Sequence, residues 1–320
     1  MPRSSPAVAH TVARSRLGAK GKKAKQQLPI PDSDPIVVTP TPTPFKADDS
    51  VDFDALERNI ERWLETPLSG FVLTTANGEE LALSEAERIE IVRVAARAHG
   101  GQRFTIAGID NPSTRETLRL AESYADAGAD MVRVRVPRGL SDSAVEDYFD
   151  AVTGNSPLPV VVIHQTFTGV PAASPETLGV VCAMDNVFGY ITDHDLRFEA
   201  YVRSEVPDDR SFWICNGGLL AYGALMGANG ACMWLGNVAP KLCMDIMTLG
   251  LQGKFAGARE LQDSASKLDR TIIKYGTPGV KEALRLLGFE GMRPRKPTPG
   301  VDADATARIR ALLESEGILR

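Results

Sequence analysis

Length and composition set the first limits on this chain. It has 320 residues, of which 43% are hydrophobic and 24% charged, with a formal net charge of −5. This is the composition of a soluble globular protein with one large or two average domains. Residues 1–27 carry seven Lys or Arg and no Asp or Glu, so the net charge of the remaining residues is about −12. An acidic body argues against a nucleic-acid-binding surface. No run approaches the ~18 apolar residues of a membrane span, which excludes an integral membrane protein.

The N-terminal segment and the cysteines bear on the compartment. Residues 1–34 are predicted to be a basic, disordered extension. Their Arg- and Ser-rich, acid-free composition is also typical of an organellar transit peptide, but they lack the apolar segment of a secretory signal. The cysteines form no CxxC pair, so we expect reduced core residues of a cytoplasmic protein and no zinc site. They are Cys182, Cys215, Cys232 and Cys243.

Strand-like and helix-like segments alternate from residue 35 to residue 252. Eight short apolar runs predict strands at 36–39, 71–75, 104–107, 131–136, 160–163, 187–191, 212–215 and 231–235. Helical periodicity follows each run, at 51–65, 84–99, 113–127, 141–152, 175–182, 194–204, 219–226 and 240–251. Ser84 and Glu87 form a capping box, and Gly100 follows the last turn of the same helix. Eight such units predict an α/β fold, the (β/α)8 TIM barrel.

The strand pattern stops after Leu251. Helical patterns at 255–275, 278–287 and 303–317 are separated by Gly and Pro, including a Pro-rich link at 293–300. We therefore predict a small all-helical C-terminal domain over residues 253–320.

Several motifs resemble one known family. The segment 223–260, GALMGANGACMWLGNVAPKLCMDIMTLGLQGKFAGARE, resembles the strand 8 region of the dihydrodipicolinate synthase / N-acetylneuraminate lyase family. In register with it stand TPTPFKADDSVD at 41–52, LTTANGEELALSEAER at 73–88 and TPGVKEALRLLG at 277–288. The resemblance covers nearly all of residues 35–320. It implies a TIM barrel with a three-helix C-terminal domain, assembled as a homo-oligomer, a dimer or a tetramer.

Members of this family are class I aldolases or lyases of pyruvate and related 2-oxo acids. A lysine at the end of strand 6 forms a Schiff base with the ketone, and no separate cofactor is needed. In this sequence Ile191 falls at the lysine position, and Ile163 falls at that of the proton-relaying tyrosine on strand 5. No lysine lies between Lys46 and Lys241, so a shift of the alignment supplies none.

Other family positions also differ. Ala76 replaces the threonine after strand 2, Arg138–Gly139 replace a tyrosine pair, and Phe167 replaces the arginine that binds the second substrate. These replacements remove the nucleophile, the proton relay and the second-substrate contact together. We therefore expect a mechanism other than lysine Schiff-base formation.

The C-terminal ends of the strands are where a barrel carries its active site. The resemblance implies that the backbone N–H groups of Ala76 and Asn77 bind a substrate carboxylate; a tight Asn-Gly turn is the alternative. Arg133 and Arg135 lie on one face of strand 4. For Arg133 we favour a partner in the helix layer; for Arg135, the helix layer and the barrel mouth are equally open.

His164 is the candidate catalytic base, because an imidazole titrates near neutral pH; a structural histidine is the alternative. Residues 192–195, Thr-Asp-His-Asp, could form a metal site with His164. We favour instead Asp193 as the N-cap of the next helix, and expect no metal. Tyr190 is expected to face the helices.

The other candidate substrate-binding residues are Arg138, Ile163, Ile191, Asn216 and Cys232. Asn216-Gly217-Gly218 resembles a phosphate-binding turn, although Gly-Gly also simply ends a strand. We therefore predict a lyase or aldolase relative that binds a 2-oxo acid or related small carboxylate at the barrel mouth. The alternative is a non-catalytic barrel, acting as a ligand sensor or a regulatory subunit.

Overall fold

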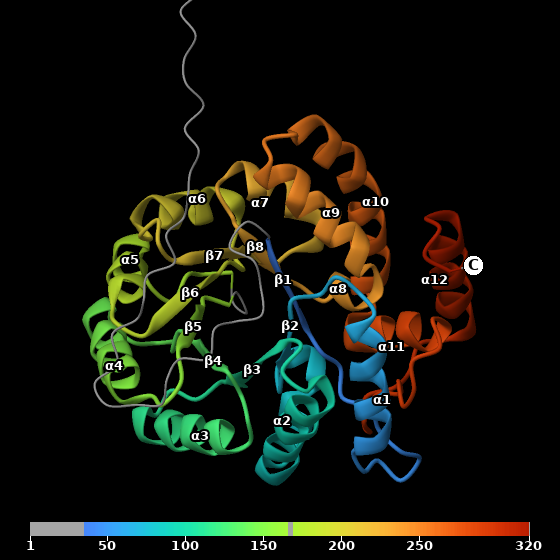
Figure 1. Ribbon diagram of the computed structural model, residues 1–320, viewed down its shortest axis with the longest axis horizontal. Helices are drawn as coiled ribbons and strands as arrows, with labels where there is room; N and C mark the ends of the chain where they lie inside the picture. The colour runs from blue at the N-terminus through green and yellow to red at the C-terminus, as the bar shows by residue number, and fades with distance from the viewer. Residues whose placement is uncertain (1–34, 166–168, 320) are drawn as a thin grey trace, which may run out of the picture.

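The strands close into a barrel, as Figure 1 shows. The computed structural model describes residues 35–165 and 169–319, so the predicted extension over 1–34 lies outside it. Each strand pairs in parallel with the next, and β8 pairs with β1. The strands are β1 (Ile36–Pro40), β2 (Gly70–Leu73), β3 (Phe104–Ile109), β4 (Met131–Arg135), β5 (Val160–Ile163), β6 (Val187–Ile191), β7 (Ser211–Ile214) and β8 (Gly230–Cys232). The (β/α)8 barrel prediction is confirmed.

Helices surround the barrel. They are α1 (Phe53–Leu64), α2 (Glu85–His99), α3 (Thr114–Asp126), α4 (Asp142–Asn155), α5 (Pro175–Ala183), α6 (Leu196–Glu205), α7 (Leu220–Leu225), α8 (Leu235–Val238) and α9 (Pro240–Leu251). Short 3₁₀ turns follow β2 (Ala76–Gly78 and Glu80–Ala82) and β7 (Gly217–Leu219). The predicted capping box of Ser84 and Glu87 begins α2, and Gly100 ends it with φ 53°. No helix within the described ranges is long and apolar enough to span a membrane.

The alternation of side chains along each strand divides the core in two. Residues such as Val132 and Val162 pack outward against the helices in the larger cluster. Their neighbours Met131, Val161 and Ile163 fill the inside of the barrel, together with side chains of the other strands. Because both faces are covered, the strands read as continuous apolar runs. This alternation decides which side chains enter the barrel interior.

Two boundaries differ from the sequence prediction. The predicted strand at 231–235 ends at Cys232, because the chain turns helical: the Gly236 N–H donates to Met233 O and α8 begins. The N-cap of α6 is Asp195, not Asp193; its carboxylate accepts hydrogen bonds from the N–H groups of Arg197 and Phe198.

Three helices follow the barrel: α10 (Phe255–Ile273), α11 (Gly276–Leu286) and α12 (Ala303–Ser315). They pack together at one side of the barrel, next to α8 and α9 (Figure 1). Buried side chains of these helices contact the barrel mouth: Gln262 of α10 donates to Gly217 O in the turn after β7, and Lys281 of α11 contacts the loops after β1 and β2. The Lys281 Nζ donates to Thr43 O at 2.6 Å and Arg293 O at 2.8 Å, and lies 2.5 Å from Glu79 Oε1.

The side chain of Lys281 is shielded from solvent. It is fully buried, and its ammonium group lies 4.4 Å from the centre of the Phe45 ring. Burial lowers the pKa of Lys281 to about 8, although the Glu79 carboxylate opposes the shift. The charge is therefore retained inside the protein only because its partners surround it.

Replacing Lys281 by methionine tests this connection. The change leaves the largely buried Glu79 carboxylate without its cation, so we expect Lys281→Met to lower the free energy of unfolding by about 3–5 kcal/mol. Urea titration followed by circular dichroism measures the loss. The exposed Lys241→Met is the matched control, with a change within about 0.5 kcal/mol. Adding Glu79→Gln to Lys281→Met should recover part of the loss; no recovery would contradict the ion pair's role.

Candidate functional site

The arginines of β4 point into the barrel. They alternate with Val132 and Val134, which pack against the helices, so Arg133 and Arg135 share the inner face with Met131. Arg133 is 3% exposed. The expected helix-layer partner of Arg133 is therefore wrong, since its face of the strand is the inner one.

Two carboxyl groups face these arginines at the mouth. Arg135 forms an ion pair with Asp110, and its Nη2 lies 3.4 Å from Glu80 Oε1. Arg133 Nη2 lies 4.0 Å from Glu80 Oε2, beyond hydrogen-bonding distance. Burial raises the pKa of Glu80, nearby Asp110 raises it further, and the two arginines oppose the shift. The mouth thus contains a compact group of alternating charges in a low-dielectric setting.

The turn after β2 presents backbone donors at the same mouth. Its first internal hydrogen bond runs from the Gly78 N–H to Thr75 O at 2.8 Å. The N–H groups of Ala76 and Asn77 precede this bond, as at any helix start, and have no backbone acceptor among residues 35–165 and 169–319. Glu79 adopts a left-handed conformation with φ 59°. Its carboxylate is anchored by Lys281 and by the Arg295 N–H at 2.9 Å.

Apolar and thiol side chains form the other inner wall. Ile163 and Ile191 lie opposite each other in the register of β5 and β6, and both are buried inside the barrel with Cys232. Burial raises the pKa of Cys232 to about 12, so the thiol is protonated at neutral pH. None of these groups is a nucleophile at neutral pH, and no residue from β2 to β8 is a lysine.

His164 points away from the barrel interior. It follows inward-facing Ile163 and packs between His194, at 4.3 Å, and Phe198, at 5.5 Å between ring centres. Its Nε2 accepts a hydrogen bond from the Ala172 N–H at 2.8 Å. Burial, with a small contribution from His194, lowers the pKa of His164 to about 3. These contacts fit a structural histidine, and its catalytic role stays a prediction that the geometry does not support.

The segment after β6 is held by a buried acid. Glu199 of α6 accepts hydrogen bonds from the N–H groups of Asp193, at 2.9 Å, and His194, at 2.8 Å. Burial raises the pKa of Glu199 to about 7. Tyr190 is fully buried and stacks on Phe212, as expected for a helix-facing aromatic. Among the residues that the structure describes, no three His, Cys, Asp or Glu side chains are arranged to hold a metal ion.

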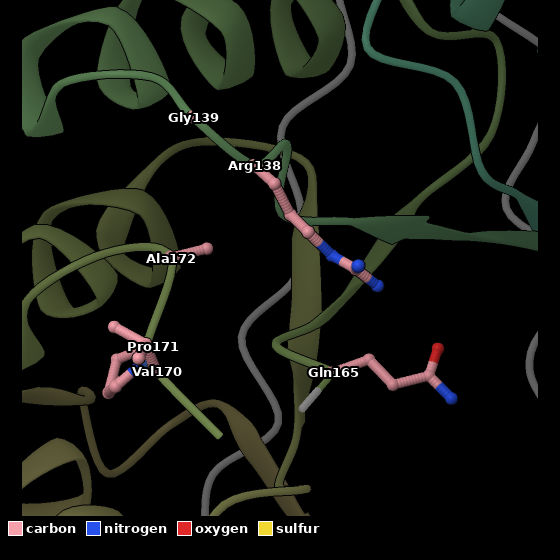
Figure 2. A pocket seen from close by; sticks show the side chains of 6 residues that line it. All are labelled: Arg138, Gly139, Gln165, Val170, Pro171 and Ala172. Carbon is pink, nitrogen blue, oxygen red and sulfur yellow. The ribbon is translucent and has the colours of Figure 1, made fainter. Parts of the chain in front are cut away.

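The remaining candidates lie at the rim. Asn216 uses its side-chain oxygen to accept the Gly218 N–H at 2.8 Å, so it shapes its own turn. Arg138 and Gln165 line a cavity of about 240 Å³, which Gly139, Val170, Pro171 and Ala172 complete. Figure 2 shows the Arg138 and Gln165 side chains pointing the same way, from the loops after β4 and β5. Phe167 lies outside the described residues.

The structure thus brings together some of the predicted residues and separates others. Arg135, Ile163, Ile191 and Cys232 share the barrel interior, whereas His164 and Asn216 do not face it. The sequence analysis missed Glu80 and Lys281. Glu80 follows Glu79, which belongs to the motif LTTANGEELALSEAER, and is the first residue of a second 3₁₀ turn. The motif placed Glu80 near the site but did not indicate that its side chain faces Arg133 and Arg135. Lys281 is the lysine of the motif TPGVKEALRLLG at 277–288, but that motif is more than 180 residues from Glu79 and did not show that the two side chains meet.

Comparisons with known proteins agree with this architecture. Residues 35–316 match the model of the Dihydrodipicolinate synthetase family. A protein of Halobacterium salinarum named as an uncharacterized DapA-like lyase is 31% identical, covering 91% of this chain and 98% of its own. The 4-hydroxy-tetrahydrodipicolinate synthase of Archaeoglobus fulgidus is 28% identical, covering 87% and 97%. The dihydrodipicolinate synthase structure from Cyanidioschyzon merolae, 22% identical, superposes with a TM-score of 0.83 and covers 90% and 99%.

The protonation state of His164 is open to direct measurement. Because Nε2 accepts the Ala172 N–H, the ring proton belongs on Nδ1. We expect ¹⁵N-histidine NMR to show this neutral tautomer unchanged from pH 8 to pH 5. An unfolded histidine gains its proton near pH 6.5, so this group lowers the stability of the fold as pH falls from about 6.5 toward 3. A midpoint above pH 6 in the folded protein would contradict the assignment.

Proposed function

Because the chain belongs to the Dihydrodipicolinate synthetase family, whose members are lyases, we propose that it binds a 2-oxo acid or related small carboxylate at the barrel mouth. We propose further that it acts without a lysine imine. One observation carries this proposal: the inner faces of β4 to β8 hold guanidinium, thiol and hydrocarbon groups but no amine. The site therefore has groups that attract an anion and lacks the group that forms a Schiff base.

The position of each group supports carboxylate binding. The N–H groups of Ala76 and Asn77 begin a turn at the mouth, where aligned backbone donors favour an anion. Arg135 stands at the end of β4 and is only partly buried. Ile163 and Ile191 close the opposite wall with hydrocarbon. A small carboxylate with an apolar or carbonyl-bearing body fits this combination of walls.

Assembly and compartment are part of the same proposal. Leu81, on the turn that follows β2, is 97% exposed, and Leu140, after β4, is 40% exposed. Apolar side chains exposed at a mouth loop support contact with a second copy of the chain. We propose a homo-oligomer, a dimer or a tetramer, located in the cytoplasm.

Reductive trapping tests the absence of an imine. Borohydride converts a lysine Schiff base into a stable secondary amine, which intact-mass measurement detects. We expect no mass increase after incubation with pyruvate, 2-oxobutyrate or 2-oxoglutarate, because none of the eight barrel strands carries a lysine. A 4-hydroxy-tetrahydrodipicolinate synthase trapped in parallel is the positive control. A stoichiometric adduct would overturn the proposed mechanism, and peptide mapping would show whether Lys281, the buried lysine beside the mouth loops, carries it.

Removing one backbone donor tests the turn. Thr75 is extended, with φ −124° and ψ −177°, a conformation that allows proline to follow. Ala76 is exposed and opens the 3₁₀ turn, where proline fits and its missing N–H leaves the turn's own bonds intact. We expect Ala76→Pro to weaken pyruvate binding, measured by calorimetry, about 10-fold or more. Ala76→Ser keeps the N–H and is the control; equal affinities of the two variants would exclude a role for this donor.

A further inference from the structure

Several buried polar atoms at the floor of the mouth have no hydrogen-bond partner within the described residues. They are Arg133 Nε and Nη2, Thr75 Oγ1 and Glu80 Oε2. A buried donor left unsatisfied costs about 1–3 kcal/mol, and more for a charged group. A cluster of such atoms therefore marks a place where a polar group is accepted from outside the chain.

These atoms belong to neighbouring positions. Gly108 of β3 pairs with Arg133 of β4 in the sheet register. Thr75 lies over the same glycine, because a Cβ at Gly108 would stand 2.8 Å from Thr75 Cγ2. Glu80 Oε2 stands 4.0 Å from Arg133 Nη2. Thr75, after β2, and Arg133, on β4, thus both lie next to Gly108 of the intervening strand β3, and Arg133 also lies beside one carboxyl group.

The neighbouring Arg135 has carboxylate partners at close range, although its Nε, too, has no hydrogen-bond partner within the described residues. It forms an ion pair with Asp110 and contacts Glu80 Oε1, so the two nearby carboxyl groups are already engaged on its side. Arg133 is the more deeply buried of the two, and its nearest carboxylate is beyond hydrogen-bonding distance. A buried guanidinium in this state lacks the planar, bidentate partner for which it is suited.

We infer that Arg133 and Thr75 form an inner carboxylate site, so that the ligand is a dicarboxylic acid bound at both ends. One carboxylate lies at the N–H groups of Ala76 and Asn77, and the other reaches the Arg133 guanidinium. This rests on the proposed function, which places a carboxylate at the turn. The two sets of donors differ in depth: Ala76 is exposed, whereas Arg133 is 3% exposed. A monocarboxylate satisfies one set, and a dicarboxylate satisfies both.

The charges at the floor agree with this ligand. Burial lowers the pKa of Arg135, and the guanidinium groups of Arg133 and Arg138 lower it further, while Asp110 and Glu80 oppose the shift. Burial raises the pKa of Glu80, which favours its protonated form beside a second carboxylate, while Arg133 and Arg135 oppose this shift. The protonated acid can donate a hydrogen bond to that carboxylate in place of repelling it.

A comparison of ligands on matched variants tests the inner site. Calorimetry would measure the affinity of wild-type protein for pyruvate and 2-oxobutyrate, and for the dicarboxylic 2-oxoglutarate and 2-oxoadipate. The variants are Arg133→Met, Arg133→Lys and Thr75→Val, with Arg115→Met as the control, since the Arg115 side chain is 92% exposed on α3. Arg133→Met replaces a buried ion by an apolar chain of similar length, a change that buried sites tolerate; thermal melting verifies that it folds.

We expect wild-type protein to bind at least one dicarboxylic acid about 10–100-fold more tightly than the monocarboxylic acids, the gain of one charge-assisted hydrogen-bonded pair. Arg133→Met should abolish this preference while monocarboxylate affinity changes less than about 3-fold; Arg133→Lys should keep part of it, and Thr75→Val should reduce it. Equal wild-type affinities for the two classes, or an unchanged preference in Arg133→Met, would overturn the inner site.

Succinate and glutarate separate the two proposals, because they carry two carboxylates and no ketone. Arg133-dependent binding of these acids without binding of any 2-oxo acid would reject 2-oxo acids as the ligand class and retain the inner site. Binding of pyruvate with no preference for dicarboxylic acids would reject the inner site and retain the proposed function. Failure of every acid to bind would reject both.

Discussion

The buried ion pair of Lys281 and Glu79 is the contact on which the geometry of the mouth depends. Glu79 is in the left-handed conformation and joins two 3₁₀ turns, so its backbone fixes the direction in which the Ala76–Asn77 donors point. Lys281 holds that residue from α11 and holds the loop after β1 through Thr43. A buried ammonium group such as that of Lys281 is stable only while its carboxylate and carbonyl partners stay in position. The C-terminal helices therefore help to shape the mouth, although the strands of the barrel are in another part of the chain.

Much of the fold follows from local patterns in the sequence. The apolar runs of β5 and β6 end where predicted, because buried parallel strands show uninterrupted hydrophobic residues. The capping box at Ser84 located the start of α2. The end of β8 was misjudged, since Met233 to Leu235 are apolar both in a strand and in the short buried helix that the chain forms. The hydrophobicity of Met233 to Leu235 indicates that these residues are buried but does not indicate whether they form a strand or a helix.

The site was harder to predict, for a physical reason. Both faces of a barrel strand are buried. The alternation of Arg133 with valines therefore shows that arginine and valine lie on opposite faces, but it does not show which of the two faces inward. Only the partners across the sheet decide the direction. His164 shows the converse: its residue type suggested proton transfer, but a backbone N–H and two aromatic rings occupy its surroundings. Chemistry at the mouth thus depends on contacts between segments far apart in the chain.

The inward arginines of β4 also bear on how the sheet assembles. A shift of β4 by one residue would exchange its faces. Val132 and Val134 would then enter the barrel, and two guanidinium groups would meet the apolar layer of Val145 and Phe149 under α4. An isoleucine or valine at these positions would hardly distinguish the two alignments. Arg133 and Arg135 make the shifted alignment much less stable, because it would bury their charges against apolar side chains. The residues that give the mouth its positive charge therefore also keep this short, otherwise apolar strand in its correct alignment during folding.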